Sequence, residues 1–241
     1  MLFRVLRAER IKAHHAPVWL AFIVLPLVPA ILGTANYVGN IGILENQWYS
    51  LWTQHTLFAS YFFLPALLSV YCGWEWRLEH SDHNFNSYLT LPASAWALYL
   101  GKLLPAVAIG VLTQVIIGVL YVVSGRLIGL DAPLPPALIS WLGCGAIGSV
   151  AVCAAQLFVS LAIRSFAVPV AIGLLGGVAG MMATIQGFGM HFPYSLLAVG
   201  MRANNPNMTI DLGQLVIMTV LFTVTFSVLT VRILMRRDVT E

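Results

Sequence analysis

The chain has 241 residues, of which 59% are hydrophobic and only 9% are charged, with a formal net charge of +3 and a mean hydropathy of +0.87. Soluble domains carry roughly 25% charged residues, so this composition excludes a soluble globular protein and indicates a membrane protein. No nucleic-acid partner is expected.

The N-terminal stretch 1–15 predicts a basic amphipathic helix on the inner membrane face. In that interpretation Leu2, Val5 and Leu6 face lipid, while the arginines meet headgroup phosphates. The alternative is a plain basic cluster that only sets the topology. The charged residues of this interfacial helix are Arg4, Arg7, Glu9, Arg10 and Lys12.

Six stretches are apolar and long enough to cross a bilayer, for which a helix needs about 20 residues. We therefore predict an all-α membrane protein with six transmembrane helices in one domain, residues 1–241. The predicted spans run from about 18–36, 56–74, 103–123, 137–163, 167–186 and 212–235.

The fifth span holds two overlapping GxxxG pairs, Gly173 with Gly177 and Gly176 with Gly180. Small residues at this spacing let helix backbones approach closely. We expect these glycines to mediate packing within the bundle.

Lysine and arginine set the orientation, because cytoplasmic loops carry an excess of them. With the N-terminus inside, the outer segments hold only Arg126 and Arg202. Both termini are therefore predicted to be cytoplasmic. The basic residues of the inner segments are Arg4, Arg7, Arg10, Lys12, Arg77, Lys102, Arg164, Arg232, Arg236 and Arg237.

The predicted spans contain few ionisable residues. No acidic residue lies deep in a span, Glu75 stands at an inner edge, and the histidines lie outside the spans or at their edges. Ion-coupled transporters usually keep such groups in the membrane, so ion coupling is not expected. The neutral residues Gln114 and Gln156 either bond to neighbouring helices or line a substrate path.

The sequence lacks the motifs of common enzymes. It has no GxxxxGK[ST] phosphate loop, no HExxH and no GxSxG, so neither enzymatic activity nor a directly bound cofactor is expected. Cys72, Cys144 and Cys153 lie in apolar stretches, which indicates small buried hydrophobes rather than disulfides or metal ligands.

The predicted inner connection 75–102 is too long for a simple turn. Ser81 or Asp82 can cap a short helix that extends to about Leu91, and Pro92 would end it. Such a helix can dock into a groove of a separate protein. The acidic and histidine side chains at its start could instead suggest a metal site, formed by Glu79, His80, Asp82 and His83.

These residues carry a resemblance to type-2 ABC exporter permeases. In that family an acidic residue after the second span precedes a coupling helix, a proline and a lysine. The matching positions here are Glu79, residues 84–91, Pro92 and Lys102. The run 8–30, with Glu9 and Lys12 before a proline-containing span, looks like the start of the lantibiotic-immunity branch.

The resemblance implies a permease subunit of the bacterial cytoplasmic membrane that pairs with a second permease, alike or different. A separate ABC ATPase dimer would dock beneath the pair and use ATP and Mg. The residues that would couple to it are Glu79, Asp82, Phe85, Tyr88, Leu89 and Pro92. The resemblance also implies short outer helices within 187–211 that dip into the membrane.

The implied cargo is a lantibiotic-type antimicrobial peptide, expelled from the membrane to protect the producing cell. One alternative is a type-2 permease for another drug, for a lipid or for a metal-related cargo. The hypothesis of a metal-related cargo rests on four residues near the outer end of the fifth span, Met181, Met182, Met190 and His191. The other alternative is a membrane sensor or assembly partner that transports nothing.

Overall fold

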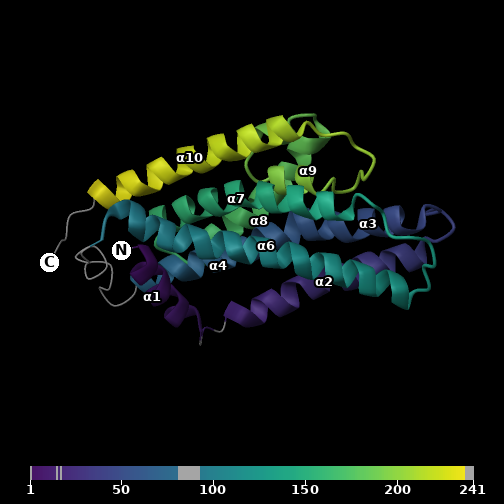
Figure 1. Cartoon of the computed structure of the whole chain (residues 1–241), viewed down its shortest axis with the longest axis horizontal. Helices are drawn as coiled ribbons and strands as arrows, with labels where there is room; N and C mark the ends of the chain where they lie inside the picture. The colour runs from purple at the N-terminus through teal and green to yellow at the C-terminus, as the bar shows by residue number, and fades with distance from the viewer. Residues whose placement is uncertain (1, 15, 17, 81–92, 237–241) are drawn as a thin grey trace.

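A computed structural model describes residues 2–14, 16, 18–80 and 93–236. All regular elements in this part are helices, and the long ones form a bundle with α1 and the end of α10 at the same end (Figure 1). The elements are α1 (Leu2–His14), α2 (Val18–Gly39), α3 (Gln47–Phe58), η1 (Ala59–Phe63), α4 (Leu64–His80), α6 (Ala95–Leu127), α7 (Leu138–Ala162), α8 (Ala167–Ile185), η2 (Gly189–His191), α9 (Leu196–Gly200) and α10 (Leu212–Arg236).

The described residues contain six helices that are long and apolar enough to cross a membrane, which confirms the predicted number of spans. Five of them correspond to the predicted stretches and extend some of them. The longest of these five, α6, begins at Ala95 rather than at about Leu103, so Lys102 lies inside this helix and not in a connection.

The second span departs most from the prediction. It is a continuous helix, Gln47–His80, in which α3, the π-helical turn η1 and α4 follow one another. At 1.5 Å per residue it is about 50 Å long, which exceeds the roughly 30 Å hydrocarbon core. The predicted start of this span at about residue 56 is therefore wrong, because the helix begins at Gln47. Polar residues lower the hydropathy at the start of this helix, so hydropathy did not predict it. Burial of Trp48 and Trp52 stabilises this part of the helix.

His55 also lies inside this helix rather than beyond its edge. The side chain is 2% exposed, and its Nε2 lies 2.9 Å from the hydroxyl of Thr34 on α2. The two helices cross closely here, because a Cβ on Gly33 would meet the His55 backbone.

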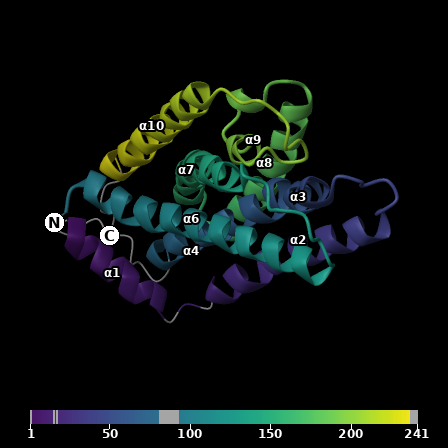
Figure 2. The ribbon, with the colours of Figure 1, turned by 45° about the vertical axis from the view of Figure 1, so that its right-hand side comes forward.

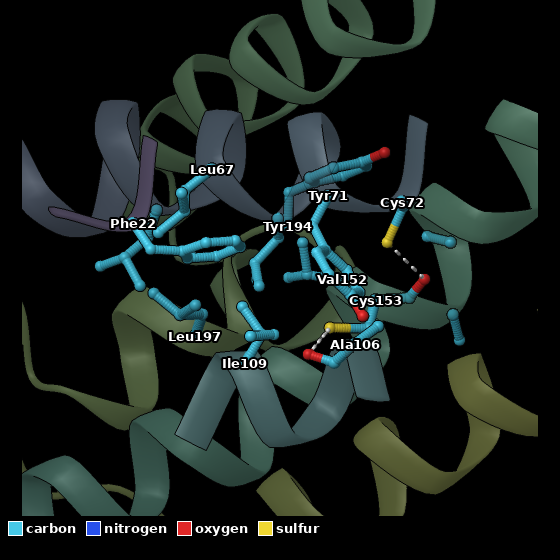
Figure 3. Close-up of a cluster of buried hydrophobic side chains, with 14 of the residues drawn as sticks. Phe22, Leu67, Tyr71, Cys72, Ala106, Ile109, Val152, Cys153, Tyr194 and Leu197 are labelled. Carbon is cyan, nitrogen blue, oxygen red and sulfur yellow. Dashed lines mark hydrogen bonds between the residues drawn. The ribbon is translucent and has the colours of Figure 1, made fainter. Parts of the chain in front are cut away.

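Helix α7 lies at the centre of the bundle, where it contacts α4, α6, α9 and α10. Cys153 on α7 and Cys72 on α4 are free and fully buried, as predicted (Figure 3). The Cys72 Sγ donates to the Cys153 carbonyl at 3.9 Å, and the Cys153 Sγ donates to the Ala106 carbonyl at 3.5 Å. Both thiols therefore act as small core side chains that join α4, α7 and α6.

The two GxxxG pairs of α8 pack on different partners. Cβ atoms on Gly173 and Gly177 would meet Ser69 and the carbonyl of Tyr61, on the second span. Gly176 and Gly180 face the outer segment instead. The predicted role in packing within the bundle is confirmed.

The segment 187–211 contains the short helices η2 and α9, as expected before the last span. Leu196 and Leu197 of α9 are fully buried. A Cβ on Gly148 of α7 would meet the Leu196 backbone, so α9 presses directly on the central helix. Whether these helices enter a membrane stays a prediction.

Candidate functional site: an ion cluster that joins three helices

Four charged side chains from three helices meet at one end of the bundle. Glu9 and Lys12 come from α1, Glu79 from the last turn of α4, and Lys102 from the third turn of α6. Figure 2 shows α1 beside the end of α4 and the start of α6. We call these four residues the ion cluster.

The cluster is a closed ring of alternating charge. The Lys102 Nζ lies 3.2 Å from Glu9 Oε1 and 3.0 Å from Glu79 Oε1. The Lys12 Nζ lies 3.2 Å and 2.6 Å from the same two atoms. Each carboxylate oxygen therefore accepts from both ammonium groups, which ties α1 to α4 and α6 at once.

Lys102 is the most buried member of the ring, with 0% of its side chain exposed. Besides the two carboxylates, its ammonium donates to the Glu75 carbonyl at 3.2 Å. An ammonium group has three protons to donate, and three acceptors are in place. The Nζ also lies 5.0 Å from the centre of the Trp76 ring, a cation–π contact.

Such a cluster contributes more to the specific arrangement of the helices than to the net stability of the fold. Desolvating buried ions offsets much of their attraction, but removing one partner costs about 3–5 kcal/mol because a buried charge is left alone. Glu75 adds a further buried carboxyl, 1% exposed, whose Oε2 has no hydrogen-bond partner among the described residues. The three helices are thus held in one specific arrangement.

Helix α1 docks on the bundle through one face. Val5 and Glu9, one turn apart, are buried, and a Cβ on Gly101 of α6 would meet the Val5 side chain. The expectation that Val5 faces lipid is wrong, because Gly101 leaves a groove that this side chain fills. The predicted arginines of this helix, Arg4, Arg7 and Arg10, are exposed.

Of the predicted coupling residues, the structure describes Glu79 alone. Asp82, Phe85, Tyr88, Leu89 and Pro92 lie outside the described residues. Glu79 is 5% exposed and belongs to the ion cluster. Sequence reasoning named Lys102 only as a position of the family pattern and did not predict its contacts with Glu9 and Glu79. It also did not predict a role for Glu75 at this site.

The comparisons with known proteins add one finding. The family model described as ABC-2 family transporter protein matches residues 5–180, well over half of the chain. The chain belongs to this family. Neither a curated protein nor a solved structure matches it. All four residues of the ion cluster lie within the matched range.

Membership of the ABC-2 family and the six apolar helices identify a multi-pass membrane protein of the permease type. It also implies a transport subunit that works with an ABC ATPase. This match does not assign the chain to the lantibiotic-immunity branch of the family.

The two predicted path residues of this ABC-2 family protein differ in their surroundings. The Gln156 Nε2 donates to the Pro169 carbonyl at 2.6 Å, and its Oε1 accepts from the Tyr194 hydroxyl at 2.7 Å. Burial raises the pKa of the Tyr194 phenol, so this donor keeps its proton. Gln156 therefore ties α7 to α8 and to the outer segment.

Gln114 is 2% exposed, and both of its amide atoms lack a hydrogen-bond partner in the described part of the chain. It lies against Gly145 of α7, since a Cβ there would be 3.0 Å from the Gln114 Nε2. A role in a substrate path stays a prediction for both glutamines.

The methionines near the end of α8 do not converge on one site. Met181 packs against the cluster that contains Ala198, Met190 packs against a different cluster that contains Leu196, and Met182 is 44% exposed. The described residues also contain no group of three His, Cys, Asp or Glu side chains that could hold a metal ion.

Proposed function

We propose that this chain is the transmembrane permease subunit of an ATP-driven ABC exporter that expels lantibiotic-type antimicrobial peptides from the membrane. An ABC ATPase dimer in the cytoplasm hydrolyses ATP with Mg and docks on the connection between α4 and α6. A second permease, alike or different, completes the membrane part.

The ion cluster is the observation that carries this proposal. Helix α4 ends at His80 and α6 begins at Ala95, so the proposed docking segment connects two helices that Lys102 and Glu79 pin together. Glu9 and Lys12 attach α1 to the same point. A push on the connection would therefore move three helices together rather than one.

The two helices that flank the connection are also the longest in the described part. The 34-residue helix Gln47–His80 and the 33-residue α6 extend from the ion cluster to the opposite end of the bundle. There the Trp52 indole donates to the Met201 carbonyl in the outer segment at 3.1 Å. Packed, rigid helices of this kind can carry a displacement from the ATPase side to the outer segment.

The proposed cargo is amphipathic and enters from the lipid. Spans in the described part present apolar side chains outward, such as Ile23 at 62% and Ile217 at 64% exposure. The ion pairs among the described residues lie in the ion cluster at one end of the bundle. This supports a substrate that is taken from the bilayer and needs no charged channel.

The proposal is tested by expressing the chain with the ABC ATPase and the second permease encoded beside it. Cells with all components should survive a lantibiotic concentration that kills cells lacking the ATPase. A permease whose purified complex shows the same helix distances with and without ATP would instead be a sensor that transports nothing. Metal that co-purifies in stoichiometric amount would favour a metal-related cargo.

A further inference from the structure

A cleft of about 350 Å³ lies between α1 and the bundle, and the proposed transport function leaves it unexplained. Leu6 on α1 and Pro105 on α6 line it, together with Tyr71 on α4 and Trp19 at the start of α2. Its volume is within the range of ligand sites, about 300–1,000 Å³. The cleft thus lies between the first helix and residues of three spans, with a largely apolar lining on the bundle side.

The two sides of the cleft differ in chemistry. Tyr71 and Ile109 on the bundle side are buried, at 3% and 6% exposure. Arg10 and His14, one turn apart on α1, line its exposed side. A ligand that fits must therefore combine an apolar part with a group that accepts hydrogen bonds and carries negative charge.

The charge of the cleft is positive on balance. Glu9 also lines it, but its carboxylate is already engaged by Lys12 and Lys102. Arg10 forms no ion pair with an acidic side chain of the described residues. An anion placed beside Arg10 would thus meet a guanidinium that suits phosphate geometry.

We propose that this cleft binds an anionic phospholipid, with the phosphate on Arg10 and His14 and the first part of an acyl chain against Tyr71 and Ile109. Helix α1 directly precedes the first span, so the cleft opens at the depth of the headgroups. Anionic lipids of the cytoplasmic leaflet attract basic segments at this depth. A cationic peptide would be repelled by the arginines of α1.

In this proposal the bound lipid fills the space between α1 and the bundle. Because Glu9 belongs both to the cleft and to the ion cluster, an occupied cleft holds α1 against α4 and α6.

Native mass spectrometry of the full chain in detergent tests this site, with phosphatidylglycerol and phosphatidylcholine of equal chain length as probes. We expect phosphatidylglycerol to bind preferentially and Arg10→Gln to reduce its occupancy at least five-fold. Arg7→Gln is the matched control, because Arg7 is exposed on the same helix but does not line the cleft. Equal losses in both variants, or equal binding of both lipids, would overturn the proposal.

A second pair of variants tests the apolar side. Ala108 is exposed on α6 and lines the cleft, so Ala108→Trp should fill it and displace phosphatidylglycerol. Val111→Trp, at a 45% exposed position outside the cleft, should retain the lipid. Unchanged lipid in Ala108→Trp would show that the lipid binds elsewhere. A cationic lantibiotic that competes for the site would show that the cleft belongs to the cargo.

Discussion

Different interactions stabilise the two ends of the bundle. One end carries the ion cluster of Glu9, Lys12, Glu79 and Lys102. The other end carries an aromatic cluster, in which Trp52 lies 5.0 Å from Tyr121 and 5.1 Å from Trp141, and Trp48 lies 5.2 Å from Tyr121 between ring centres.

The difference shows what each end is suited to do. Aromatic packing contributes through buried area, and the indoles of Trp48 and Trp52 and the phenol of Tyr121 donate to backbone carbonyls. Buried ion pairs contribute little net stability but penalise any arrangement that separates them. The aromatic end therefore fixes the fold, while the charged end allows few positions for α1, α4 and α6.

The largest effect is expected from Lys102→Met. This variant keeps most of the length of the side chain but leaves Glu9 and Glu79 without their buried partner. The free energy of unfolding should fall by about 3–5 kcal/mol, as measured by thermal unfolding in detergent. Arg232→Met, which removes an exposed cation from α10, is the control and should change little. Equal stability of the two variants would contradict a structural ion cluster.

At the aromatic end, Trp52→Phe should have a smaller effect. It keeps an aromatic ring but removes the indole donor, so the buried Met201 carbonyl loses its 3.1 Å bond. An unsatisfied buried acceptor costs about 1–3 kcal/mol. Because Trp52 holds the outer segment, hydrogen exchange at residues 196–203 should also accelerate. Unchanged exchange there would mean that this segment is held without Trp52.

A milder change at the same end is Tyr121→Phe. It removes one bond, from the Tyr121 hydroxyl to the Trp48 carbonyl at 2.7 Å, and leaves the ring packing in place. We expect a loss of about 1 kcal/mol in the same unfolding measurement. A loss as large as that of Lys102→Met would reverse the contrast between the two ends.

The smallest effect is expected from Lys12→Met. The Lys12 side chain is 34% exposed, so water and salt screen its pairs with Glu9 and Glu79. Partly exposed ion pairs contribute about 0–1 kcal/mol, and this difference should shrink further in high salt. The Lys102→Met loss should persist in the same buffer, and a parallel decrease would show that water reaches Lys102.

Hydropathy predicted the six spans, because a lipid-exposed helix must be apolar along most of its length. It placed the start of the second span too late, because Gln47, Ser50 and Gln54 lower the local hydropathy. That helix start is stabilised by contacts with α2 and α6 and by the packing of Trp52 on Trp141 of α7. Such contacts leave no local pattern in the sequence.

The contacts within the ion cluster could not be predicted from the sequence for a similar reason. Glu9 and Lys102 are 93 positions apart, and each taken alone resembles a charge at a membrane edge. The spacing of Glu9 and Lys12 marked one half of the ring. Its other half depends on how α4 and α6 meet, which only the tertiary structure shows.

The most direct test of the account is the amount of ABC ATPase that co-purifies with the permease when both are expressed together. Glu79→Gln removes a charge of the ion cluster beside the proposed docking segment, and Arg232→Met removes an exposed charge elsewhere. We predict that Glu79→Gln loses most of the ATPase, that Arg232→Met retains it, and that both variants still unfold cooperatively. A folded Glu79→Gln permease that retains the wild-type amount of ATPase would contradict the account.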